Sequence, residues 1–119
     1  MRGVLLPIVT LAALTCATAT AARPSLSILP RSVRAGGTVA ISGSADGCRS
    51  GNTVYVISRA FQATHEFAGV PAVFAKVRRG GRFNATTRIP RSKRPARYGV
   101  TARCGGGNLG VIAYVRVTH

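Results

Sequence analysis

The side chains that could carry out acid–base or metal chemistry are few in this chain of 119 residues. Of its two carboxylates, Asp46 lies in an Asp-Gly dipeptide that is typical of a turn. The other, Glu66, directly follows His65, and neighbours on a strand point to opposite faces of it. Glycoside hydrolysis needs two facing carboxylates and a metal site needs several ligands, which these residues and the terminal His119 do not supply. We therefore expect no catalytic residue, no metal site and no cofactor.

Nucleophile and phosphate-binding motifs are missing as well. The chain has no Gly-x-Ser-x-Gly segment, in which a serine nucleophile would sit on a sharp turn. Its glycine run at 105–107 is followed by an alternating apolar pattern typical of a strand, whereas a phosphate-binding loop leads into a helix N-terminus. The sequence therefore indicates a protein that is not an enzyme.

The N-terminal segment has the features of an export signal. Arg2 gives a short positive start, residues 4–16 are almost wholly apolar, and residues 17–22 are small alanines and threonines suited to signal peptidase. The apolar run is too short for a membrane span, which needs roughly 20 residues. We expect residues 1–22 to be a signal peptide cleaved near Ala22. A retained membrane anchor and a lipoprotein modified at Cys16 are the alternatives.

Cleavage there would leave residues 23–119, or 119 − 22 = 97 residues, which is enough for one domain. The protein would then be secreted or associated with the cell envelope. Of the three cysteines, Cys48 and Cys104 would remain as an even pair in an oxidising compartment. We expect a disulfide between them rather than two free thiols. Closing so long a loop is predicted to stabilise the fold by roughly 4 kcal/mol.

Positive charge dominates the composition. The chain has 17 basic and 2 acidic residues, and without Arg2 the net charge is 16 − 2 = +14. Guanidinium groups suit bidentate contacts with phosphate or carboxylate, so we expect attraction to anionic polymers and surfaces. The alternative is that the charge reflects codon usage and solubility alone. Two clusters are candidate anion-binding residues: Arg78, Arg79 and Arg82, and then Arg88, Arg91, Lys93, Arg94 and Arg97.

A nucleic-acid partner is not expected. Proteins that bind single strands present exposed aromatic rings within a basic groove. Phe83 and Tyr98 fall instead on predicted core faces, and no helix-turn-helix, zinc finger or RNP-like segment occurs. Export would also separate the protein from the chromosome.

The segments that must position these side chains are short strands. Turn residues recur along the chain, and the apolar residues between them alternate with the period of two that a strand shows. No window has a helical period with caps, although residues 59–68 could form a turn of helix. The seven predicted strands are 25–29, 38–43, 53–58, 72–77, 82–89, 98–104 and 111–117.

Turn and core residues along the chain resemble a known family. The segment 27–39 contains Ser-Ile-x-Pro and Gly-Gly-Thr-Val, 81–90 contains Gly-x-Phe-x-Ala-Thr before Ile-Pro, and 98–105 is Tyr-x-Val-Thr-Ala-x-Cys-Gly. These features are similar to the immunoglobulin-like domains common in proteins exported by high-GC Gram-positive bacteria. The resemblance covers nearly all of the mature chain. It implies an all-β, immunoglobulin-like antiparallel sandwich of about seven strands with one disulfide. The arginine content and residues 59–67 depart from the pattern.

The same resemblance implies where the cysteines lie. In the immunoglobulin strand order, the loops that hold Cys48 and Cys104 are at one end of the sandwich. The disulfide would therefore join two loops rather than cross the core. Tyr98, near the start of the sixth predicted strand, could form a tyrosine corner, but we expect ordinary core packing there.

We expect a non-enzymatic module that attaches to an anionic envelope polymer or to another protein. One alternative is a cationic effector acting on anionic envelopes, although the amphipathic basic helix typical of such proteins is missing from the sequence. The other is a carrier of a small apolar ligand. Its cleft would be lined by Phe61, Phe67, Val70 and Phe74, and we favour the interpretation that these side chains only cap the sandwich. The sequence does not define an oligomeric state.

Overall fold

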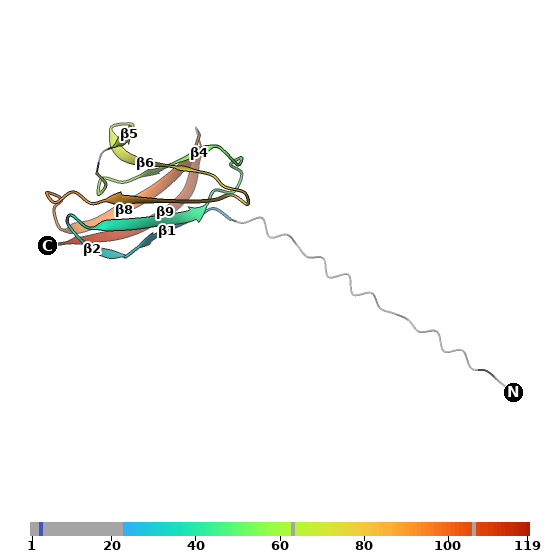
Figure 1. Cartoon of the computed structure of the whole chain (residues 1–119), viewed down its shortest axis with the longest axis horizontal. Helices are drawn as coiled ribbons and strands as arrows, with labels where there is room; N and C mark the ends of the chain where they lie inside the picture. Colours follow the sequence, from blue (N-terminus) through green and yellow to red (C-terminus); the bar gives the residue numbers. More distant parts are fainter. Residues whose placement is uncertain (1–2, 4–22, 63, 106) are drawn as a thin grey trace.

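A computed structural model describes residue 3 and residues 23–62, 64–105 and 107–119 (Figure 1). The predicted signal peptide, including Cys16, lies outside these residues except for Gly3. All regular structure in the described part is β-strand, arranged in two sheets. No helix that is long and apolar enough to cross a membrane occurs among the described residues.

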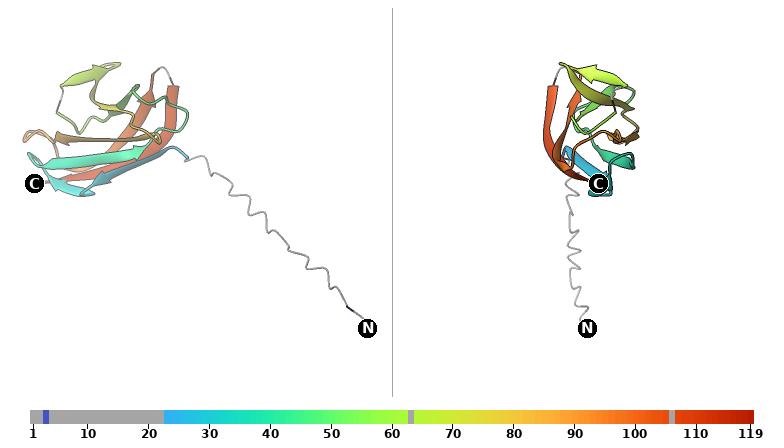
Figure 2. Two further views of the ribbon diagram at one scale, coloured as in Figure 1. Left: turned by 45° about the vertical axis from the view of Figure 1, so that its right-hand side comes forward. Right: turned by 90° about the vertical axis from the view of Figure 1, so that its left-hand side faces the viewer.

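The two sheets differ in size. Figure 2 shows the β8–β9 hairpin on one side of the molecule, in orange and red, and β3, in teal, on the other. The smaller sheet has the order β1-β3-β7 and is antiparallel, with strands Ser25–Leu29, Thr38–Ser44 and Arg82–Arg88. The larger has the order β2-β9-β8-β4-β6-β5, with strands Ser32–Arg34, Gly107–Thr118, Ala96–Cys104, Thr53–Ile57, Val70–Lys76 and His65–Phe67.

The described residues form nine strands rather than the seven expected. The first additional strand, β2, follows the cis Leu29–Pro30 bond, where the chain leaves β1 and pairs in parallel with the end of β9. The second, β5, pairs with β6 inside the segment whose conformation the sequence left open. Both have only three residues, so the alternating pattern that identifies a strand was too short to detect in them.

Alternation along the strands builds the core between the sheets. Val39 and Ile41 on β3 are buried as expected, and Val54 and Val56 on β4 are buried against them from the other sheet. β4, which is apolar on both faces, lies inside the six-stranded sheet between β8 and β6. The outward-pointing side chains of that strand are half-buried.

The disulfide joins Cys48, in the loop between β3 and β4, to Cys104, the last residue of β8. Their Cα atoms are 6.1 Å apart. The bond therefore fastens that loop to one end of the six-stranded sheet and does not cross the core, as expected. Cys48 is half-buried and packs against the core cluster.

Removing the disulfide should destabilise the protein. We expect a variant with Cys48→Ser and Cys104→Ser to lose about 4 kcal/mol of unfolding free energy, because the unfolded chain regains the freedom of a long loop. Urea denaturation of both proteins, without reductant, measures the difference. A loss below about 1 kcal/mol would contradict the constraint assigned to this bond.

Gly43 allows β1, β3 and β7 to pack closely. It lies opposite Leu26 on one side and Phe83 on the other. A Cβ atom built on Gly43 would be 2.7 Å from Cζ of Phe83 and would overlap the carbonyl oxygen of Ser25. The ring of Phe83, which is only 2% exposed, therefore fills the space that a side chain at position 43 would need.

A methyl group at position 43 should destabilise the protein. We expect Gly43→Ala to lower the unfolding free energy by about 2–3 kcal/mol, because the β1 backbone and the Phe83 ring must both move. Gly99→Ala is the matched control, since its Cβ would meet only Ile112 and Tyr114, at 3.6 Å and 4.0 Å. Urea denaturation should show little loss for the control. Equal losses for both variants would contradict the close approach.

Candidate functional site

The basic residues of the described domain are all accessible. Within residues 23–119 every arginine and lysine is exposed, apart from Lys93 and Arg103, which are half-buried. The two carboxylates lie far apart, because Asp46 is in the loop that carries Cys48, whereas Glu66 pairs with Pro71 at the opposite end of β6. No cluster of three or more histidine, cysteine, aspartate or glutamate side chains suited to a metal ion occurs among the described residues.

The two basic clusters lie at opposite ends of β7. Arg78 and Arg79 belong to the turn between β6 and β7, and Arg82 is the first residue of β7. The Gly81 carbonyl of this turn accepts a hydrogen bond from the amide of Ala45, near the disulfide. The second cluster begins with Arg88, the last residue of β7, and continues through the loop into β8. That loop is held to the other end of the domain, since the amide of Gly36 donates to the carbonyl of Ile89.

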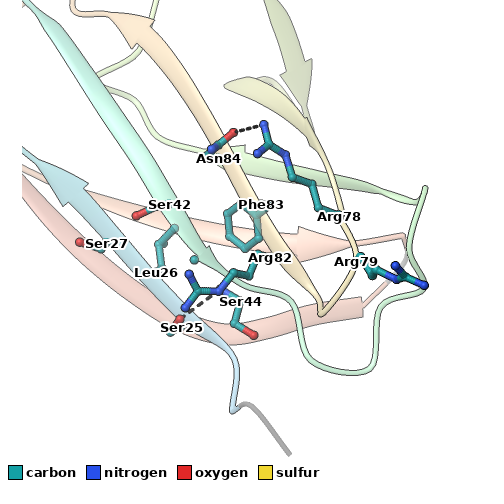
Figure 3. Close-up of a pocket in the computed structure, with 11 residues that line it drawn as sticks. Ser25, Leu26, Ser27, Ser42, Ser44, Arg78, Arg79, Arg82, Phe83 and Asn84 are labelled. Carbon is teal, nitrogen blue, oxygen red and sulfur yellow. Dashed lines mark hydrogen bonds between the residues drawn. The ribbon is translucent and has the colours of Figure 1, made fainter.

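The first cluster borders a hollow on the outer face of the three-stranded sheet (Figure 3). The hollow has a volume of about 420 Å³ and is open to solvent. We call it the serine–arginine hollow. Residues from β1, β3, β7 and the preceding turn line it: Ser25, Leu26, Ser27, Ser42, Gly43, Ser44, Arg78, Arg79, Arg82, Phe83 and Asn84.

The sequence identified the arginines of this hollow but not its hydroxyl groups. Ser25 lies opposite Ser44 in the β1–β3 register, and Ser27 lies opposite Ser42. All four side chains sit at alternating positions of their strands, on the face turned away from the core. The signal that could have revealed them was the spacing of two residues between Ser25 and Ser27, and between Ser42 and Ser44 at the end of the second predicted strand.

Tyr98 contacts the loop that carries the second cluster. The hydroxyl of Tyr98 donates a hydrogen bond of 2.7 Å to the carbonyl oxygen of Arg94, and the ammonium group of Lys93 lies 5.9 Å from the centre of the same ring. Tyr98 thus combines partial burial against the core with the backbone contact of a tyrosine corner, whereas we had expected core packing alone. Arg91 lies against Gly36, with its Cγ 2.9 Å from the position of a built Cβ.

A row of aromatic rings crosses the outer face of the six-stranded sheet. The centres of the Tyr55 and Phe74 rings are 4.7 Å apart, and those of Tyr55 and Phe67 are 5.8 Å apart. His65 stacks on Phe74 at 4.0 Å, and the guanidinium of Arg103 lies 4.8 Å from the centre of Phe67. We call these five residues the aromatic row. β4 pairs with β6 and β8, and β5 pairs with β6, which brings these residues together although they are far apart in the sequence.

The cleft expected from Phe61, Phe67, Val70 and Phe74 does not form as described. Phe61 is 1% exposed and belongs to the core, whereas Phe74 is 42% exposed on the outer face. Val70 lines a separate shallow hollow with Arg59 and Arg97. Phe67 pairs with Val70 across β5 and β6, and Tyr55 contacts the rings of both Phe67 and Phe74.

Comparisons with known proteins establish the fold and nothing further. No family model and no curated protein matches the chain. One similar solved structure is the Pseudomonas fluorescens alkylpurine DNA glycosylase AlkC bound to DNA containing an abasic site analog, with 16% identity and a TM-score of 0.53. The match covers 82% of this chain but only 31% of the glycosylase chain. Another is macromomycin, with 15% identity and a TM-score of 0.51, over 80% of this chain and 97% of that one.

The hydrogen bond of Tyr98 should stabilise the basic loop. We expect Tyr98→Phe to lower the unfolding free energy by about 1 kcal/mol, because the carbonyl of Arg94 loses its donor. Amide hydrogen exchange should also become faster in residues 90–95. Tyr114→Phe is the control, since this exposed ring contacts Arg97 through its face, and the change should have little effect. Unchanged stability and exchange in Tyr98→Phe would argue against the role given to the hydroxyl.

Proposed function

We propose that this protein is an exported, non-enzymatic immunoglobulin-like module that binds an anionic polymer of the cell envelope. The disulfide supports a location outside the cytoplasm, because such bonds persist in oxidising compartments. The separation of Asp46 from Glu66 supports a non-enzymatic role, since no pair of carboxylates faces a common substrate.

The immunoglobulin-like assignment is supported by the arrangement of the strands. The seven strands expected from the sequence form the body of both sheets, and the two additional ones, β2 and β5, are the edge strands of the larger sheet. The disulfide joins Cys48, in the loop between the second and third expected strands, to Cys104 at the end of the sixth expected strand. We infer on this basis that the chain is one of the immunoglobulin-like domains of proteins exported by high-GC Gram-positive bacteria.

The observation that carries the proposed function is the placement of exposed arginines at both ends of the domain. β7 has seven residues, so its length separates the two basic clusters by about 20 Å. A polymer with regularly spaced negative charges can contact both clusters at once, and a second contact on the same chain raises the overall affinity. Two carboxylates in residues 23–119 cannot neutralise sixteen basic side chains. The domain therefore keeps a net positive charge that attracts anionic polymers.

The aromatic row favours a second candidate function, the transport of a small apolar ligand. Rings on an open sheet face offer flat apolar area, although they enclose no cavity. Native mass spectrometry of protein isolated from its producing cells tests this alternative. A reproducible bound mass that disappears in Phe74→Ala would support it, and a mass equal to that of the polypeptide would oppose it.

Attachment to the envelope should be electrostatic. We expect the purified protein to be retained on isolated envelopes at low salt and released by moderate salt, because counter-ions screen the arginine contacts. A variant in which Arg88, Arg91 and Arg94 are replaced by Gln should elute at lower salt. Neutral dextran beads provide the control surface. Passage of the wild-type protein through the envelope fraction at low salt would refute the proposal.

A further inference from the structure

We propose that the serine–arginine hollow binds the phosphodiester groups of a polyol phosphate polymer. The inference rests on the proposed function for the polymeric nature of the ligand, and it adds the chemical class and the place of binding. The hollow is formed by residues far apart in the sequence, since Ser25 on β1 and Arg82 on β7 face the same space (Figure 3).

Two of the three arginines are directed to the hollow. Arg78 donates a hydrogen bond of 3.2 Å from Nη2 to Oδ1 of Asn84, which holds its guanidinium over the outer face of β7. Arg82 lies opposite Ser44 in the β3–β7 register and extends toward Ser25 in Figure 3, whereas Arg79 points away. A guanidinium has five N–H donors in a planar fork, so Arg78 keeps donors free for phosphate oxygens.

The turn that carries these arginines is already ordered. The amide of Arg78 donates to the carbonyl of Arg82 at 2.7 Å, and the amide of Gly81 donates to the carbonyl of Arg78 at 2.9 Å. Gly80 and Gly81 both have positive φ, at 87° and 81°, a backbone conformation that side chains disfavour. The backbone of the turn therefore loses little conformational entropy when an anion binds, and the main entropic cost falls on the arginine side chains.

Serine hydroxyls supply contacts of a second kind. The Oγ of Ser25 accepts a hydrogen bond of 3.1 Å from the amide of Ser44, so its own hydroxyl proton is available for an acceptor. Ser27 and Ser42 are exposed beside it. A hydroxyl both donates and accepts, which suits a polymer that carries phosphate oxygens together with alcohol groups.

The lining of the hollow favours a polyol phosphate over a nucleic acid. Its one aromatic residue is Phe83, which is 2% exposed and offers no face on which a base could stack. The described residues that line it include no carboxylate. The site can therefore contact phosphate and hydroxyl groups, but it has no ring with which to hold a base.

The shape of the surface fits a chain rather than a single ion. A volume of about 420 Å³ exceeds the space that one phosphate group occupies. A second hollow of about 430 Å³ adjoins it and shares Ser42 and Asn84, and its remaining lining residues lie further along β3 and β7. Successive units of a polymer can therefore lie along the outer face of the three-stranded sheet, toward the second basic cluster.

The test compares two variants that lose the same charge at opposite ends of β7. Arg78→Gln with Arg82→Gln alters the hollow, and Arg88→Gln with Arg91→Gln is the matched control. The probes are fluorescently labelled poly(glycerol phosphate), oligodeoxythymidine of equal charge, and polyglutamate. Fluorescence anisotropy at fixed salt measures their dissociation constants, and thermal unfolding confirms that each variant is folded.

We expect the hollow variant to bind poly(glycerol phosphate) about tenfold more weakly, and the control about two- to threefold more weakly. A Ser25→Ala, Ser42→Ala variant should bind poly(glycerol phosphate) about threefold more weakly, with unchanged binding of polyglutamate. Equal losses in the two arginine variants would overturn the assignment to the hollow, although anion binding itself would stand. Oligodeoxythymidine or polyglutamate bound as tightly as poly(glycerol phosphate) would overturn the ligand class. No binding of any probe by the wild-type protein would refute the proposed function as well.

Discussion

The shortage of carboxylates constrains the whole domain. Residues 23–119 contain sixteen basic side chains but only two carboxylates, Asp46 and Glu66. Most guanidinium groups would therefore have no ion-pair partner if they were buried. A buried charge without a partner is very costly, and the arginines must therefore reach solvent. Ser58 is the single buried polar side chain among the described residues. The inner faces are accordingly apolar, and the arginines lie on the outer faces and at the ends of the sandwich-like fold.

Much of the fold could be predicted from the sequence, because a two-residue period and turn residues are local signals. All seven predicted strands occur, and the even number of cysteines in residues 23–119 predicted the disulfide. β2 and β5 were missed because three residues carry no detectable period. Phe61 was named as a residue of an alternative apolar cleft, although capping of the sandwich was preferred, and it is buried in the core. Its place depends on the path of the chain after β4, which tertiary packing determines rather than local pattern.

The candidate site was predicted only in part, because it depends on strand register. The arginines of the β6–β7 turn are conspicuous in the sequence, whereas the serines beside them become meaningful only once β1, β3 and β7 are aligned. The aromatic row has the same origin: Tyr55 and Phe74 are direct partners across two strands. Sequence separation carries no information about such neighbours until the pairing is known.

The loop between β7 and β8 bears on resistance to proteolysis. It contains Arg91, Lys93 and Arg94, the residue types after which trypsin-like proteases cut, and exposed loops are the usual places of such cleavage. A protease must draw several residues into an extended shape. The bond from Tyr98 to the Arg94 carbonyl resists that change, and Pro95 follows directly. The contact that fixes the conformation of this loop therefore also opposes cleavage after its basic residues.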